Sequence, residues 1–242
     1  MQSIRKILRE TFILDETILD KNVLKAIMMA GAAGSGKSYI TSLITQNVHP
    51  APKIIDSDKI FEAKLKSANL PAKLSAVNSP ERDKQMEKRE EAIIANVKVL
   101  NSLLNGFMPL IIDGTGKNYN KFIERKKALE SMGYDVLCLM VNTSLEVAQE
   151  RNAKRPRSLT PEEVESFWKT CQANFQRYPH DFRFHLTVNN DPGQLDNNRL
   201  IRVIDKFFSS PLQNPLGQEL YKNKDKGPIS RSLKPIELAP FH

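Results

Sequence analysis

Cysteines, aromatic residues and long apolar runs are all scarce in this sequence, and each scarcity excludes a class of protein. Two cysteines among 242 residues suggest neither a disulfide framework nor a cysteine-based metal site. An aromatic content of 7% argues against a dedicated platform for stacking nucleic-acid bases. No apolar run approaches the roughly 20 residues that a membrane-spanning helix needs, and the first residues lack the apolar core of a signal peptide. We therefore expect a cytoplasmic protein without a membrane partner.

The composition that is present describes an ordinary globular protein with a basic surplus. Hydrophobic residues make up 40% of the chain and charged residues 26%. The formal net charge of +8 is compatible with nucleic-acid or nucleotide partners. Part of this surplus lies near the C-terminus and in one short segment rich in arginine and lysine, so the charge alone does not identify a ligand.

The most informative segment covers residues 31–38, where GAAGSGKS matches the G-x-x-x-x-G-K-S pattern of a P-loop. An apolar run precedes it and helical apolar spacing follows it, which is the context that this motif requires. Glycines allow backbone N–H groups to turn towards phosphate oxygens, and a helix N-terminus adds further donors. A glycine-rich turn that binds nothing is the disfavoured alternative. The residues expected to bind ATP are Gly31, Ala33, Gly34, Ser35, Gly36, Lys37 and Ser38.

Short apolar strands alternate with amphipathic helices along most of the chain. We expect strands over 26–30, 53–56, 109–112, 135–141 and 183–188, and helices over 39–47, 58–67, 81–104, 119–132, from 144 onwards, 160–179 and 193–209. This alternation predicts an α/β fold of the P-loop NTPase and kinase type, in which helices flank both faces of a mostly parallel sheet. Ligands bind such a sheet at the carboxyl ends of its strands.

Three aspartates follow predicted strands at that edge. Asp58 begins a helix, where its carboxylate is a candidate to accept the proton of an attacking hydroxyl; the alternative is that it merely caps the helix. For Asp56 a structural hydrogen bond is the more natural role. Asp113 ends an apolar strand in the form of a Walker B element, and we expect it to bind Mg²⁺ together with Ser38.

Two further groups complete the candidate site. Thr115 and Asn118 lie on the turn after Asp113, where they either bind the substrate or shape the turn. Arg151 and Arg155 are four residues apart and would share one face of a helix. Their guanidinium groups are candidates to neutralise the triphosphate; the alternative, which the P-loop makes the weaker one, is a solvated basic cluster at a helix end.

These features follow one another in an order that resembles a known family. The P-loop, the I-x-x-D at 55–58, the D-x-T at 113–115 and the R-N-x-K-R at 151–155 together resemble phage-type polynucleotide 5′-kinases and, more loosely, the zeta-toxin kinases. The resemblance covers roughly residues 25–180. It implies that Lys37 and Ser38 hold ATP and Mg²⁺, that Asp58 activates the acceptor hydroxyl, and that Arg151 and Arg155 belong to a lid over the phosphates.

The resemblance has one departure that bears on the acceptor. Polynucleotide kinases carry an arginine three residues after the catalytic aspartate, whereas this sequence has Phe61 there. This departure bears against a polynucleotide as the acceptor. The acceptor expected from the whole pattern is a nucleic acid or a nucleotide-like molecule. The first alternative is a UDP-amino sugar, as in the zeta-toxin kinases.

The sequence predicts three parts. These are a helical segment over 1–24, a P-loop kinase domain over 25–209, and a flexible, basic, proline-rich tail over 210–242. The tail gives a further alternative function, in which the chain does not catalyse transfer but binds nucleotide and docks onto a protein partner through this segment.

Overall fold

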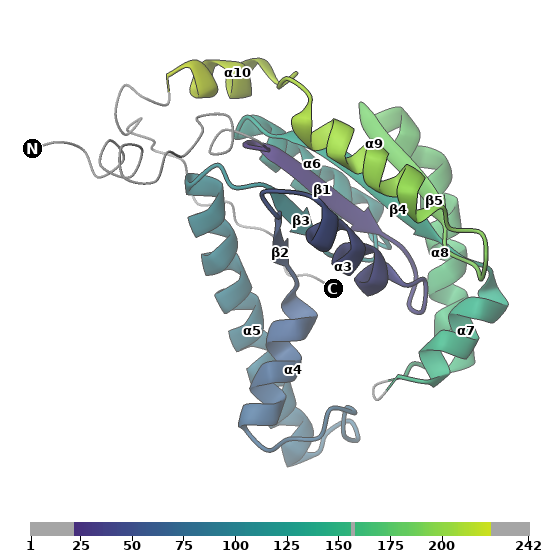
Figure 1. Cartoon of the computed structure of the whole chain (residues 1–242). Coiled ribbons are helices and arrows are strands. Elements are labelled where there is room, and N and C mark those ends of the chain that lie inside the picture. Colours follow the sequence, from purple (N-terminus) through teal and green to yellow (C-terminus); the bar gives the residue numbers. More distant parts are fainter. Residues whose placement is uncertain (1–21, 156–157, 224–242) are drawn as a thin grey trace, which may run out of the picture.

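The structure, a computed structural model, describes residues 22–155 and 158–223. Within these residues the centre is a five-stranded sheet in the order β2-β3-β1-β4-β5 (Figure 1). Its strands are β1 (Lys25–Ala30), β2 (Lys53–Ile55), β3 (Leu110–Ile112), β4 (Asp135–Asn142) and β5 (Phe184–Asn189). Every pairing in this sheet is parallel. The predicted α/β fold with a parallel sheet is thus confirmed.

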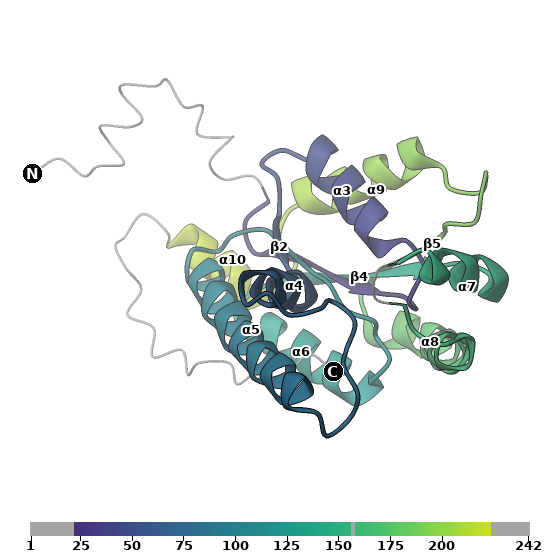
Figure 2. The ribbon, with the colours of Figure 1, turned by 90° about the horizontal axis from the view of Figure 1, so that it is seen from below.

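Helices cover both faces of the sheet and divide the core into two halves (Figures 1 and 2). One face carries α3 (Lys37–Asn47) and α9 (Asn197–Ser209), and the other carries α5 (Pro80–Asn105), α6 (Tyr119–Ser131) and α8 (Pro161–Asp181). Strand β1 shows the division directly. Ala26 and Met28 pack into one half and Ile27 and Met29 into the other, because successive side chains of a strand point to opposite faces. All four are fully buried, as expected for a central parallel strand.

Helix α4 (Ser57–Ser67) pairs with α5 in an arm that extends beyond the sheet (Figure 1). Phe61 and Leu65 of α4 pack with Ala92 of α5 in a small apolar cluster of their own. Lys64 Nζ lies 2.8 Å from Glu91 Oε2 across the pair. The arm therefore holds the start of α4 beside the carboxyl edge of β2.

Helix α8 begins with a capping box. Thr160 accepts a hydrogen bond from the Glu163 N–H, the Glu163 carboxylate accepts one from the Thr160 N–H, and Pro161 occupies the first helical position. The helix predicted over 160–179 is thus confirmed.

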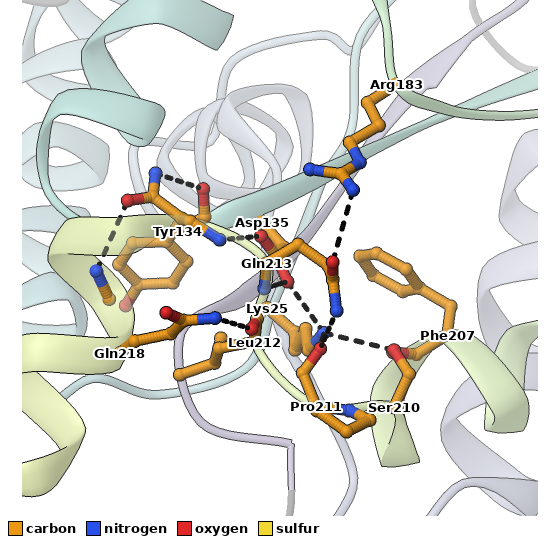
Figure 3. Close-up of polar contacts among 12 residues, drawn as sticks. Lys25, Tyr134, Asp135, Arg183, Phe207, Ser210, Pro211, Leu212, Gln213 and Gln218 are labelled. Atoms are coloured by element: carbon orange, nitrogen blue, oxygen red, sulfur yellow. Dashed lines mark hydrogen bonds and ion pairs between the residues drawn. The ribbon is translucent and has the colours of Figure 1, made fainter.

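Residues 210–223 correct the predicted tail. The chain continues along the domain and forms α10 (Pro215–Lys222), whose Leu220 is buried in the core. Asp135, at the start of β4, accepts the backbone N–H groups of Gln213 and Asn214, each at 2.9 Å (Figure 3). The prediction of an extended tail is therefore wrong for this stretch, because Leu212 and Leu220 pack against the core and the contacts to Asp135 are with backbone N–H groups, which leave no mark on the sequence.

The remaining predictions for the termini concern residues 1–21 and 224–242, which lie outside the described residues. Across the described part of the chain, no helix combines the length and the apolar character needed to cross a membrane.

Candidate active site

The P-loop joins β1 to α3 at the carboxyl edge of the sheet. β1 lies between β3 and β4, so the loop leaves the sheet at the point where such folds bind ligands. The backbone of Gly34 has a φ of +81°, and a Cβ there would lie only 2.1 Å from the Ala148 carbonyl oxygen. Both the backbone conformation and the lack of space therefore require glycine at this position.

The loop offers hydrogen-bond donors that suit phosphate groups. Helix α3 begins after Gly36, which has no side chain to accept from the N–H groups of the first turn. The Ser35 hydroxyl is buried and has no hydrogen-bond partner among the described residues. Lys37 Nζ donates to the carbonyl oxygens of Gly31 at 2.7 Å and Ala32 at 3.1 Å, which places its ammonium over the loop. This donor set fits the phosphates of a nucleotide.

Carboxylates gather beside Lys37. Burial raises the pKa of the Asp113 carboxyl; Lys37 lowers it, and Asp56 and Asp58 raise it. The P-loop, Asp113 and the pair Asp56 and Asp58 follow β1, β3 and β2, which are neighbouring parallel strands, so these residues share one edge of the sheet. Asp113 Oδ1 is buried without a hydrogen-bond partner in the described part of the chain. An unpaired, buried carboxylate oxygen at the edge that holds the P-loop fits a Mg²⁺ ion, which prefers oxygen ligands and one or two carboxylates. Ser38, the second residue of α3, is the hydroxyl ligand that the sequence predicts.

The structure separates the roles of the two aspartates that follow β2. The Asp56 side chain accepts the backbone N–H groups of Asp58 and Lys59, so Asp56 is the N-cap of α4. The structural role predicted for Asp56 is confirmed, and the alternative in which Asp58 is the cap is wrong. Asp58 lies in the first turn of α4, with an exposed side chain at the edge where a substrate would approach.

Thr115 and Asn118 both shape the turn after Asp113. The Thr115 carbonyl accepts the Gly31 N–H at 2.9 Å, and its hydroxyl accepts the Lys117 N–H at 3.2 Å. Asn118 caps α6 by accepting the N–H of Lys121. These contacts correspond to the alternative in which Thr115 and Asn118 shape the turn. That either residue binds substrate stays a prediction.

The two arginines differ from one another in position. Helix α7 (Leu145–Ala153) ends before Arg155, so the expectation that Arg151 and Arg155 share a helical face is wrong. Arg155 is exposed beyond the helix end. Arg151 lies against the P-loop: its Nη1 is buried without a partner among the described residues and lies 3.6 Å from the position of a Cβ on Gly36. Arg151 is therefore the better placed of the two to contact a nucleotide.

Sequence reasoning missed a pair of polar residues after β5. The Asn190 side chain donates to the Ser35 carbonyl at 2.7 Å, and Asp191 accepts the N–H of Ser144 at 2.9 Å and the hydroxyl of Thr143. Asn190 and Asp191 follow the end of a parallel strand. The rule that identified Asp58 and Asp113 would therefore have found them too.

Comparison with known protein families gives one match that covers most of the candidate site. A family model described as an AAA domain matches residues 26–178, which include the P-loop, Asp58, Asp113 and Arg151. The match covers more than half of the chain, and the chain belongs to this family of P-loop proteins. The predicted class of P-loop phosphotransferase is confirmed at this level, and membership implies the general use of ATP and Mg²⁺.

One curated relative matches over part of its length. The chain is 27% identical to the chloroplastic adenylate isopentenyltransferase 3 of Arabidopsis thaliana over 168 residues, which cover 63% of this chain and 49% of that protein. The chain thus spans about half the length of the curated relative it matches.

Solved structures share the fold. A structure of the PezAT chromosomal toxin–antitoxin system of Streptococcus pneumoniae has a TM-score of 0.52 at 16% identity, with 92% of each chain covered. A candidate kinase from Chloroflexus aurantiacus has a TM-score of 0.51 at 14% identity, with 77% of this chain and 96% of that chain covered. At these identities the likeness shows the fold alone.

Proposed function

We propose that this chain is a kinase that transfers the γ-phosphoryl group of ATP to a hydroxyl group of a nucleic acid or a nucleotide-like acceptor. The observation that carries the proposal is that Lys37, Asp58 and Asp113 follow three neighbouring parallel strands at the carboxyl edge that also holds the P-loop. A cation for the phosphates, a carboxylate for the hydroxyl proton and a carboxylate for a metal ion are the groups that phosphoryl transfer uses.

Each residue has a role that its position supports. Lys37 and the N–H groups at the start of α3 bind the phosphates and hold the γ-phosphorus in line with the acceptor. Asp58 accepts the proton of the attacking hydroxyl at its carboxylate oxygen. Arg151 stabilises negative charge on the phosphate oxygens. Ser38 and Asp113 would hold Mg²⁺, which supplies neutralisation of phosphate charge when bound.

Two observations support a nucleotide-like acceptor. The chain carries a formal net charge of +8, which suits a polyanion. The name of the plant relative includes adenylate, a nucleotide.

Phe61 is 1% exposed and packs inside the arm, so the side chain at this position cannot bind a substrate phosphate as an arginine would.

The test is transfer of radiolabelled γ-phosphate with Mg²⁺ to a panel of acceptors. The panel contains 5′-hydroxyl DNA and RNA, nucleosides, adenylate and UDP-amino sugars, with Lys37→Ala as the inactive control. Label on an oligonucleotide, a nucleoside or adenylate supports the proposal. No label on any acceptor, with ATP still bound, contradicts it.

A sugar-nucleotide kinase is the second candidate. It is favoured by the resemblance of the motifs at 31–38, 55–58, 113–115 and 151–155 to those of the zeta-toxin kinases. Salt distinguishes the two candidates, because binding of DNA or RNA weakens steeply with ionic strength through counterion release, whereas binding of a UDP-sugar responds much less.

A further inference from the structure

Asn190 joins three elements of the candidate site. Its Nδ2 donates to the Ser35 carbonyl in the P-loop at 2.7 Å, and its backbone N–H donates to the Asn142 carbonyl at the end of β4 at 2.9 Å. Its own carbonyl accepts a hydrogen bond from Arg151 Nη2 at 2.9 Å. Because Asn190 is only 7% exposed, these contacts are shielded from water and hold the three elements in one arrangement.

Gly36 shows how closely Asn190 and Arg151 approach the loop. A Cβ on Gly36 would lie 2.1 Å from Asn190 Nδ2 and 3.6 Å from Arg151 Nη1. The amide of one residue and the guanidinium of the other therefore lie against the same peptide, immediately before Lys37. Arg151 Nη1 is buried here without a partner in the described residues, so it is available to a ligand in the cradle.

Asp191 holds the N-terminal end of α7, the helix that carries Arg151 in its last turn. Its carboxylate accepts the N–H of Ser144 at 2.9 Å and the hydroxyl of Thr143. Ser144 is the N-cap of α7, and Arg151 lies in the last turn of α7. Helix α7 is thus fastened to residues 190–191 at both ends, and the distance from Arg151 to the P-loop depends on how Asn190 is held.

We propose that Asn190 is a positioning residue that couples Arg151 to the P-loop. Its amide fixes its own peptide against Ser35, and that peptide in turn aims the Arg151 guanidinium at the phosphate cradle. The inference rests on the proposed function for the role of Arg151 as a phosphate ligand, but it does not depend on the acceptor.

The test is a double-mutant cycle of nucleotide affinity, measured by calorimetry with ATP and Mg²⁺. Arg151→Ala and Asn190→Ala are each expected to weaken ATP about tenfold. If Asn190 acts through Arg151, the double variant is no more than about twofold weaker than the weaker single variant. The ratio of ATP affinity to ADP affinity changes in the same direction in both single variants, whereas simple loss of packing would weaken both nucleotides alike.

Two variants keep the result interpretable. Asn190→Asp preserves the shape but loses the donor to Ser35, and it is expected to weaken ATP at least as much as Asn190→Ala. Asn189→Ala is the matched control, since this exposed neighbour bonds to Gln194 instead of the P-loop, and its ATP affinity stays at the wild-type value. Thermal unfolding shows that each variant is folded at the temperature of the titration.

Losses that multiply to about a hundredfold in the double variant would overturn the coupling, as would wild-type affinity in Asn190→Ala. The cycle uses nucleotide binding alone, so it separates this inference from the proposed function. A coupled cycle in a protein that transfers no phosphate refutes the proposed function and not the coupling. Additive losses in a protein that does transfer phosphate refute the coupling alone.

Discussion

One lysine begins β1 and a second begins α3, after the P-loop, and the two lysines have opposite surroundings. Lys25, at the amino edge of the sheet, is 1% exposed, and its ammonium bonds to Asp135 at 2.8 Å, Ser210 Oγ at 3.2 Å and the Pro211 carbonyl at 3.4 Å (Figure 3). Lys37, after the carboxyl edge, is partly exposed and bonds to carbonyl oxygens of the P-loop. One lysine closes a structural network and the other faces a site.

The same contrast holds for the neighbouring acids. Both carboxylate oxygens of Asp135 are bonded, to Lys25 and to the backbone of residues 213–214. At the carboxyl edge, by contrast, Asp113 Oδ1 and Arg151 Nη1 are buried without partners among the described residues. A buried polar group left unpaired costs free energy, and a ligand bound at this edge would pair these two. The comparison assigns stability to the amino edge and binding to the carboxyl edge.

Substitution of Lys37 by Met should have the largest effect on function and a small one on stability. Phosphoryl transfer is expected to fall by about 10⁴-fold or more, because the phosphates lose their main cation. The free energy of unfolding should change by less than about 1 kcal/mol, because the Lys37 side chain is partly exposed and its two bonds are to neutral loop carbonyls. Transfer assays and urea unfolding measure the two effects, and a large loss of stability would break the division between the edges.

Substitution of Asp58 by Asn should lower turnover by about 10²- to 10³-fold while ATP affinity stays within about twofold. The amide keeps the size of the side chain but cannot accept the proton. Single-turnover transfer and an ATP titration on the same protein separate the two quantities. Wild-type turnover with every working acceptor would show that Asp58 is not the base.

Substitution of Lys25 by Met is the matched opposite of the Lys37 variant. It leaves the Asp135 charge buried and unpaired, and we expect a loss of about 3–5 kcal/mol in the free energy of unfolding. Adding Asp135→Asn removes that charge and should recover part of the loss. Urea unfolding measures both, and ATP affinity at a temperature where the variants are folded should equal that of the wild type. A weaker affinity would show that the two edges are coupled through β1.

The two edges also differ in how much the sequence predicts. The P-loop is local, and Asp58 and Asp113 each follow a strand, so pattern and strand order suffice to bring them together. The bonds from Gln213 and Asn214 to Asp135 span 78 and 79 residues and involve no apolar pattern, so nothing local indicates them. The position of Arg155 depended on where α7 ends, and helix ends are the least predictable feature of a sequence.

Substitution of Asn214 by Ala should give the smallest effect. It tests how residues 210–223 are attached to the rest of the domain. The side chain caps α10 through the N–H groups of Leu216 and Gly217, and its amide donates to the carbonyl of Glu130 at 2.7 Å. The backbone bond to Asp135 survives the change, so we expect a loss of about 1–2 kcal/mol.

The control for this variant is Gln213→Ala, whose exposed side chain bonds to the Pro211 carbonyl and to Arg183 (Figure 3). It should cost less than about 0.5 kcal/mol, because exposed side chains contribute little to stability. Urea unfolding compares the two variants. Equal stabilities would mean that the Asn214 side chain adds nothing to the attachment of residues 210–223, and a changed ATP affinity in either variant would show that the amino edge acts on the site.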